Sequence, residues 1–177
     1  MAEVYDLEDE MTQMEEDRVE AEIAAKDFNS PLSLLEPPDP VCVESGSSLK
    51  QAIDKLVENK VGCVLITKSK KLIGMITERH ILQTIAHRAL DLDREKIDDH
   101  MVTQPKVLKM SDPILDALRF FITENIRHIP IVNDRHEPVG YTSVRGMINY
   151  IVSFFTEDVI NLPPNPLRFG ASQADGA

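Results

Sequence analysis

The 177-residue sequence predicts a mixed α/β fold of the α+β kind, made of two tandem strand-helix-strand-strand-helix units. The main observation is an internal repeat, because the segment 40–79 matches the segment 105–145. In addition, each copy holds two short apolar runs joined by a polar turn, which is the pattern of a β-hairpin. Helix-start signals precede the remaining periodic segments. The body of the chain is therefore two copies of one unit.

The repeat is clearest at a few chemically distinctive positions. One constant shift along the chain aligns three pairs, which are Gly74 with Gly140, Thr77 with Ser143, and Arg79 with Arg145. Further upstream, a shift that is shorter by one position aligns Leu49 with Ile114. We interpret the change of shift as one extra residue in the first helix of the second copy. This interpretation aligns the apolar run 64–66 with 130–132.

Each copy is expected to open with a strand and then a helix. Ser48 and Gln51 have the spacing of a capping box at the start of the first helix. In the second copy, Asp112 and Pro113 are expected to be the N-cap and the first helical residue. Apolar residues at helical spacing follow in both copies, so one face of each helix is expected to join a core.

A hairpin and a second helix complete each copy. The polar segments 68–71 and 133–137 separate apolar runs, so they are predicted to be the hairpin turns. The second helices are expected to be capped by Thr77 and Ser143 and to include residues 81–89 and 147–155. Both caps directly follow a predicted strand.

Charge and composition divide the chain into four segments. We predict an acidic helix or tail at 1–30, a first unit at 31–95, a second unit at 96–160 and an irregular tail at 161–177. Residues 1–30 hold 11 acidic and two basic residues, whereas the rest holds 19 acidic and 17 basic residues. Two interpretations of the acidic segment stay open. It is either a solvated leader, or an arm that packs on a partner subunit or a basic protein.

The overall charge excludes some classes of partner and predicts a location. A formal charge of -11 and a pI near 4.9 argue against a general binder of nucleic acid or of an anionic membrane. The sequence has no signal-peptide pattern and no apolar run of the roughly 20 residues that span a bilayer. Its two cysteines fit a reducing compartment. A cytoplasmic protein without nucleic-acid or membrane partners is expected.

The hairpin ends carry a motif with a family resemblance. Two apolar residues, Gly, two further residues, Thr or Ser, one residue and Arg occupy 72–79, and a similar pattern recurs at 139–145. This motif resembles the cystathionine-beta-synthase (CBS) domain, and so does the linker 97–103 with its Met101. The resemblance covers about residues 31–156, which is two complete CBS domains.

A CBS pair implies a particular architecture and ligand. The resemblance implies that the units pack sheet to sheet about a pseudo-twofold axis, leave two clefts for adenosine nucleotides such as AMP, ADP or ATP, and commonly form a homodimer. In the family, the motif Thr or Ser and an Asp three residues later hold the ribose. The hydroxyl positions are Thr77 and Ser143, but the Asp positions hold His80 and Gly146. Loss of the carboxylate weakens the expected ribose contact.

The family also implies cationic contacts to the phosphates. The candidates are Arg79 and Arg145 in the motif, and Arg127 and His128 before a predicted strand. Each arginine of the motif has an alternative role in a surface ion pair. With Thr77, His80 and Ser143 these residues form the predicted site.

Catalysis and metal binding have no support in the sequence. Phosphate-loop, nucleophile-elbow and zinc-protease motifs are absent, and the histidines and cysteines lack metal-ligand spacing. The family resemblance, taken with these absences, implies a non-catalytic regulatory module that binds an adenosine-type nucleotide and controls an unidentified partner protein. The alternative is a ligand-independent scaffold for dimerisation and docking, which the replaced Asp positions favour.

Overall fold

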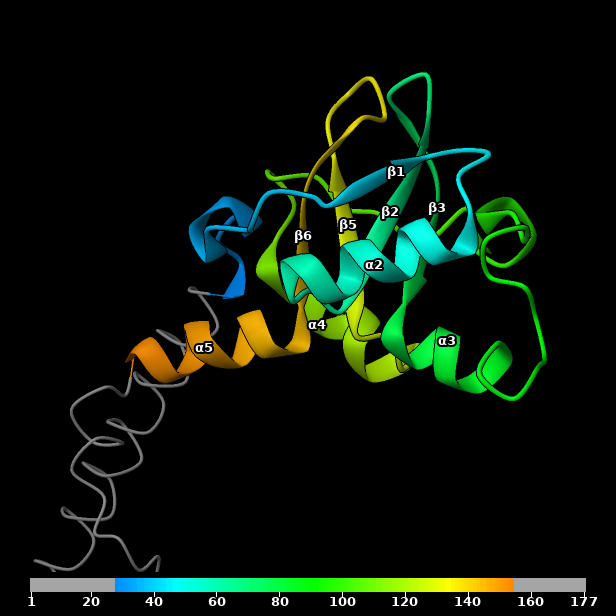
Figure 1. Ribbon diagram of the computed structural model, residues 1–177. Coiled ribbons are helices and arrows are strands. Elements are labelled where there is room, and N and C mark those ends of the chain that lie inside the picture. Colours follow the sequence, from blue (N-terminus) through cyan, green and yellow to red (C-terminus); the bar gives the residue numbers. More distant parts are fainter. Residues whose placement is uncertain (1–27, 155–177) are drawn as a thin grey trace, which may run out of the picture.

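The computed structural model describes residues 28–154, and side chains up to residue 153 (Figure 1). The helix predicted near the N-terminus and the tail predicted at 161–177 lie outside these residues. The first unit contains β1 (Cys42–Glu44), α2 (Leu49–Asn59), β2 (Cys63–Lys68), β3 (Lys71–Thr77) and α3 (Glu78–Thr84). The second contains α4 (Ile114–Thr123), β5 (His128–Val132), β6 (Pro138–Ser143) and α5 (Val144–Phe154). The mixed fold and its repeat are confirmed.

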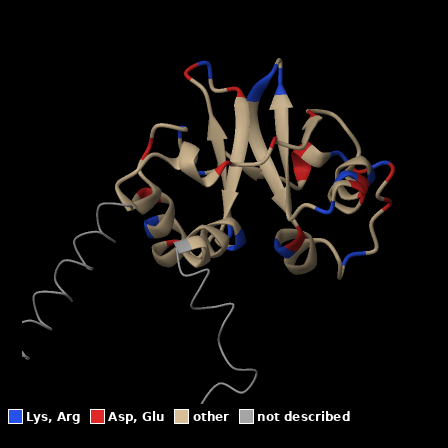
Figure 2. Ribbon diagram, turned by 90° about the vertical axis from the view of Figure 1, so that its left-hand side faces the viewer, with Lys and Arg blue, Asp and Glu red and all other residues tan. Residues whose placement is uncertain are grey.

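The strands form two small sheets in the middle of the protein. β1 pairs parallel with β2, and the β2–β3 hairpin is extended by β4 (Val102–Thr103). In the second unit β5 and β6 pair antiparallel, and the expected first strand is reduced to a parallel bridge between Leu108 and Ile131. Figure 2 shows the strands in the centre and helices on either side.

Strand β2 is buried on both of its faces. Val64 and Ile66 pack with apolar residues of α2, whereas Cys63 and Leu65 lie in a cluster that also holds Val132 of the second unit. Both faces therefore exclude water, which explains the uninterrupted apolar run in the sequence. The units consequently meet through their sheets, as the resemblance implied.

The opening segment of each unit packs on the other unit. The 3-10 helix η1 (Leu32–Leu35) opens the first unit, but the N–H of Leu32 donates to the Asp112 carbonyl at 2.8 Å. The side chain of Leu32 is fully buried in the core of the second unit. Since η1 belongs by sequence to the first unit, this contact crosses the predicted boundary.

The equivalent contact occurs in the opposite direction. The 3-10 helix η2 (Ile97–Asp99) opens the second unit, yet Ile97 is fully buried in the core of the first. Its N–H donates to the Ser47 carbonyl at 3.0 Å. The boundaries 31–95 and 96–160 stay a prediction about sequence repeats, and the packing exchanges the opening segments of the two repeats.

The strand register corrects the sequence alignment. β-bulges follow Ile66 and Ile131, so β2 and β5 are related by the shorter of the two shifts, the one that aligns Leu49 with Ile114. The extra residue is therefore in the second hairpin turn, where 133–137 replaces 68–71, and not in the first helix as predicted. The correct equivalents of Gly62 and Cys63 are Arg127 and His128.

Three of the four helix caps predicted from the sequence form in the structure. The Ser48 capping box forms, Thr77 accepts from the N–H of His80, and Ser143 accepts from the N–H of Gly146. The prediction for Asp112 was wrong, because its carboxylate accepts from the N–H of Lys109 and Pro113 is the N-cap.

The second helix of the first unit is shorter than predicted. It ends at Thr84, and not at residue 89. The Thr84 hydroxyl donates to the His80 carbonyl, and the N–H of Ala86 donates to the Ile81 carbonyl five residues earlier. The regular ladder of the helix is therefore interrupted at this point.

The exchanged anchors make a prediction about stability. Leu32→Ala and Ile97→Ala should each lower the free energy of unfolding by about 2 to 5 kcal/mol, since each leaves a cavity in a fully buried site. Leu34→Ala is the matched control, because Leu34 in the same segment is 54% exposed. Urea unfolding measures all three. A loss for Leu32→Ala no larger than for Leu34→Ala would contradict the anchoring role.

Candidate functional site

A cleft of about 440 Å³ lies between the units. The β3–α3 junction of the first unit forms one wall, and the segment that follows β4 forms another. The turn from α4 to β5 closes it from the second unit. We call this space the inter-unit cleft. It brings together five of the seven predicted site residues, Thr77, Arg79, His80, Arg127 and His128.

The β3–α3 junction fixes the position of Thr77. Its Oγ1 accepts from the N–H of His80 at 3.1 Å, and the N–H of Glu78 donates to the Gly62 carbonyl at 3.2 Å. The hydroxyl hydrogen of Thr77 is not used by this cap. Thr77 therefore combines the predicted helix cap with a hydroxyl donor on the cleft wall that has no acceptor among the described residues.

Arg79 crosses from the first unit to the second. Its Nη1 donates to the backbone carbonyl of Asn125 at 3.3 Å, with the side-chain oxygen of Asn125 at 3.5 Å. Asn125 has a left-handed backbone with φ of 52° at the start of the α4–β5 turn. Arg79 thus holds the two walls together through neutral oxygens, which leaves its positive charge uncompensated by these contacts.

His80 is held by the linker between the units. Its Nε2 lies 2.8 Å from the carbonyl oxygen of His100, and since a carbonyl only accepts, this nitrogen carries the proton. The His100 ring in turn lies 2.8 Å from Glu95 through its own Nε2. In neutral His80 only Nδ1 is left, and it acts as an acceptor. The ring can receive one hydrogen bond from a ligand hydroxyl, whereas the family Asp accepts several.

His128 is wedged between the units. A Cβ atom at Gly62 would lie 2.6 Å from its Nε2, so the ring occupies the space that only glycine leaves open. The ring centroid is 6.2 Å from that of Tyr141. Its Nδ1 is buried and has no hydrogen-bond partner among the described residues.

Burial lowers the pKa of His128. Desolvation is the main cause, Arg127 adds to it, and Glu78 opposes it. The ring is therefore neutral at pH 7, which favours a hydrogen-bond contact over the ionic phosphate contact expected from the sequence.

The positive charge of the cleft comes from arginine and lysine. Arg127 is exposed and has no ion pair within the described residues. Lys106 was missed by the sequence analysis; its Nζ is 3.5 Å from Glu124 and 5.6 Å from the centre of the Phe120 ring. The repeat gave no signal for it, because Val41 is its equivalent in the first copy. Met75, Val102 and Ile126 provide apolar surface in the same cleft.

Ser143 and Arg145 lie elsewhere. They line a second hollow of about 440 Å³, whose opposite wall is the segment 34–38. Gly146 lines the same hollow, and its N–H donates to Ser143 Oγ at 3.1 Å. The structure therefore does not join these two predicted residues to the other five.

Comparison with known proteins identifies the family. The family profile described as CBS domain matches residues 35–87 and 97–153, well over half of the chain. The chain is a CBS-domain protein. An uncharacterized 17.7 kDa protein of Acidianus ambivalens is 24% identical over 115 residues, which cover 64% of this chain and 68% of that protein. The mitochondrial CBS domain-containing protein CBSX3 of Arabidopsis thaliana is 25% identical over 63% of this chain and 56% of its own length.

Solved CBS structures have the same fold. The CBS domain protein PAE2072 from Pyrobaculum aerophilum, solved in complex with AMP, has a TM-score of 0.62 and 27% identity, covering 71% of this chain and 98% of that one. The CBS domain pair of protein MJ0100, in complex with methylthioadenosine and S-adenosylmethionine, has a TM-score of 0.61 and 18% identity, with 69% and 99% coverage. The second likeness shows the fold alone.

Residues 28–154 contain neither a cluster of metal-ligating side chains nor a membrane-spanning helix. Within that range, no group of three or more His, Cys, Asp or Glu side chains has an arrangement that could hold a metal ion. None of the helices found there is long and apolar enough to cross a membrane.

The wedged histidine predicts a pH dependence of stability. Because folding lowers the pKa of His128, protonation favours the unfolded chain, so this residue costs stability as pH falls below its unfolded pKa of about 6.5. The loss of unfolding free energy between pH 7.5 and 5.5 should therefore be smaller in His128→Gln than in the parent. Urea titrations at several pH values measure the difference. Parallel pH profiles would contradict a neutral, buried His128.

Proposed function

We propose that this CBS-domain protein is a non-catalytic regulatory module that binds a phosphorylated adenosine nucleotide, of the AMP, ADP or ATP class, in the inter-unit cleft. The observation that carries the proposal is the convergence of Arg79, Lys106 and Arg127 on one cleft that also has apolar walls. Such a combination suits a ligand with an aromatic base and an anionic end. The AMP complex of the Pyrobaculum aerophilum relative supports the choice of nucleoside.

The side chains on each wall of the inter-unit cleft suit a different part of the nucleotide. The Thr77 hydroxyl donates to a ribose oxygen, and His80 accepts from a ribose hydroxyl through Nδ1. Arg79 and Arg127 approach the phosphates from opposite units, and His128 contributes a neutral hydrogen bond. A phosphate bound between the arginines competes with Asn125 for Arg79, so binding alters a contact between the units. Through this altered contact between the units, ligand binding would be transmitted to a regulated partner.

Phosphate should contribute more to affinity than ribose does. ATP or ADP is expected to bind more than about tenfold more tightly than adenosine, and the difference should shrink with salt. Calorimetry at two salt concentrations measures it. Equal affinities for adenosine and ATP would contradict the proposal.

Matched arginine variants locate the phosphate site. Arg127→Gln should weaken ATP about tenfold or more and leave adenosine nearly unchanged, because a hydrogen bond to a charged group is worth about 1.5 to 3 kcal/mol. Arg145→Gln is the control, since Arg145 lies in the other hollow. If Arg145→Gln weakens ATP as much as Arg127→Gln does, the nucleotide is not in the inter-unit cleft.

The runner-up is a ligand-independent scaffold. The observation in its favour is that His80 already bonds to the linker carbonyl of His100, in place of a free carboxylate. Thermal-shift measurements with AMP, ADP, ATP, NAD, S-adenosylmethionine and cyclic dinucleotides separate the two functions. A ligand at 100 times its dissociation constant adds about 2.7 kcal/mol of stability, and the scaffold shows no shift with any compound.

The surface supports the expected homodimer. Equivalent helices of the two units expose equivalent apolar side chains, and the four that are more than half exposed are Val57, Ile122, Leu82 and Ile148. A second copy would cover such a face by twofold symmetry. Residues 154 and 155, at the end of the predicted helix 147–155, have side chains outside the described part.

Light scattering at tens of micromolar tests the dimer. A mass of about twice the 19.9 kDa chain is expected, and Leu82→Glu together with Ile148→Glu should reduce it to that of one chain while circular dichroism stays unchanged. An exposed polar control is Gln83→Glu. A parent mass equal to that of a single chain, independent of concentration, would contradict the dimer.

Location and partner belong to the same proposal. We place the protein in the cytoplasm, with an unidentified regulated protein as its partner and neither nucleic acid nor a membrane. The matched regions span 68%, 37% and 56% of the first three relatives. The functions of those whole proteins are therefore not assigned to this chain.

A further inference from the structure

The two hairpin turns differ in how well their own contacts stabilise them. In the first turn, Ser69 and Lys70 have φ angles of 52° and 69°. Residues other than glycine and asparagine are uncommon at two successive positive φ angles in a hairpin turn. Lys68 and Lys71 flank it and pair directly opposite each other across the two strands. Like charges at opposed positions destabilise a hairpin.

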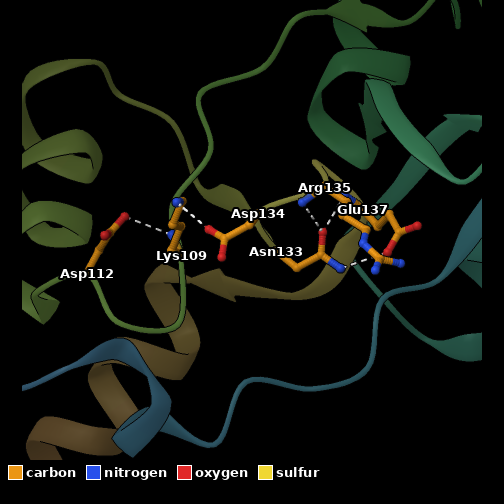
Figure 3. A network of polar contacts seen from close by, with 6 residues as sticks. All are labelled: Lys109, Asp112, Asn133, Asp134, Arg135 and Glu137. Carbon is orange, nitrogen blue, oxygen red and sulfur yellow. Dashed lines mark hydrogen bonds and ion pairs between the residues drawn. The ribbon is translucent and has the colours of Figure 1, made fainter.

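In the second turn, side chains of the turn itself form hydrogen bonds with its backbone N–H groups (Figure 3). Asn133 Oδ1 accepts from the N–H groups of Arg135 and Glu137, each at 2.9 Å, and its amide donates to the Glu137 carboxylate at 2.8 Å. Asp134 pairs with Lys109 at 2.7 Å. The first turn therefore keeps an unfavourable arrangement of lysines that its counterpart avoids, which is expected where a turn has a function.

The two turns together form a basic surface. They lie side by side, because the N–H of Leu72 donates to the His136 carbonyl at 2.9 Å. The cations on them are Lys68, Lys70, Lys71 and Arg135, all exposed and none in an ion pair within the described part of the chain. We call these four residues the basic hairpin surface, and Figure 2 shows basic residues at the upper ends of the hairpins.

The nearby acidic groups are already engaged. The Glu44 carboxylate accepts from the Thr67 hydroxyl and from the N–H of Ser69, both at 2.9 Å. The pKa of Asp98 is lowered by hydrogen bonds from Ser45 and Gly46, with a smaller contribution from Lys68. These carboxylates are held by neutral donors, whereas the lysines of the turn are exposed. An acidic ligand would relieve the repulsion between Lys68 and Lys71.

We propose that the basic hairpin surface binds the acidic N-terminal segment, residues 1–27, of the same chain. This segment contains 11 acidic and two basic residues, a net charge of -9 in a protein whose remainder is close to neutral. At about 3.3 Å per residue the 27 residues before Phe28 reach at most about 90 Å, well beyond the size of a domain of this length. The tether also supplies an effective concentration in the millimolar range, so weak screened contacts suffice.

Zero-length carbodiimide cross-linking of the full chain tests the proposal. The reagent joins a carboxylate to an amine that touches it, and mass spectrometry of tryptic peptides locates the links. Links from 1–27 should reach Lys68, Lys70 and Lys71 about fivefold more often than Lys60, which is exposed and has no ion pair within the described residues, because a preference of about 1 kcal/mol corresponds to that ratio. The preference should disappear in 0.5 M salt, where charges are screened within about 4 Å.

Matched variants and isotopes complete the test. Arg135→Gln removes a charge from the surface without removing a reactive amine, so it should reduce the links to the three lysines. Arg88→Gln, an exposed arginine outside the surface, should leave them unchanged. In a mixture of ¹⁴N and ¹⁵N chains the links should join like with like. Equal yields at all exposed lysines, or links that join mostly different chains, would overturn the proposal.

Discussion

The site depends on the exchange of opening segments between the two units. Ile97 is fully buried in the first unit, and the chain that follows it forms β4 and then the wall of the inter-unit cleft. Leu32 provides the equivalent anchor in the second unit. Each unit thus completes its core with a residue from the opening segment of the other unit. Because neither core is complete alone, the two units and the cleft between them are expected to form together.

The cleft owes its chemistry to differences between the copies. The corrected register makes Gly62 equivalent to Arg127 and Cys63 to His128. At the cleft, glycine from one unit leaves the space that the imidazole of the other occupies. Gly62 on one side and Arg127 and His128 on the other give an asymmetric site from a symmetric fold. The exchanged segment adds Lys106, so the positive charge comes from three separate parts of the chain.

The sequence predicted the architecture and most of the cleft, for reasons visible in particular residues. Thr77 and Arg79 were found because the motif repeats, and Arg127 and His128 because basic residues precede an apolar strand. The prediction that Ser143 and Arg145 share in a nucleotide site stays untested, and they face a hollow walled by segment 34–38. Lys106 could not be found, since its place depends on the exchange. The misplaced extra residue came from aligning apolar runs, which slide by one position without losing their match.

The central claim is that a phosphorylated nucleotide occupies the inter-unit cleft and contacts both units. The most direct measurement is a crystal structure of the full chain grown with saturating ATP. The account predicts ATP between the β3–α3 junction and the α4–β5 turn, with its phosphates beside Arg79 and Arg127. ATP bound in the hollow beside Ser143 and Arg145, or an empty inter-unit cleft at saturating ATP, would contradict it.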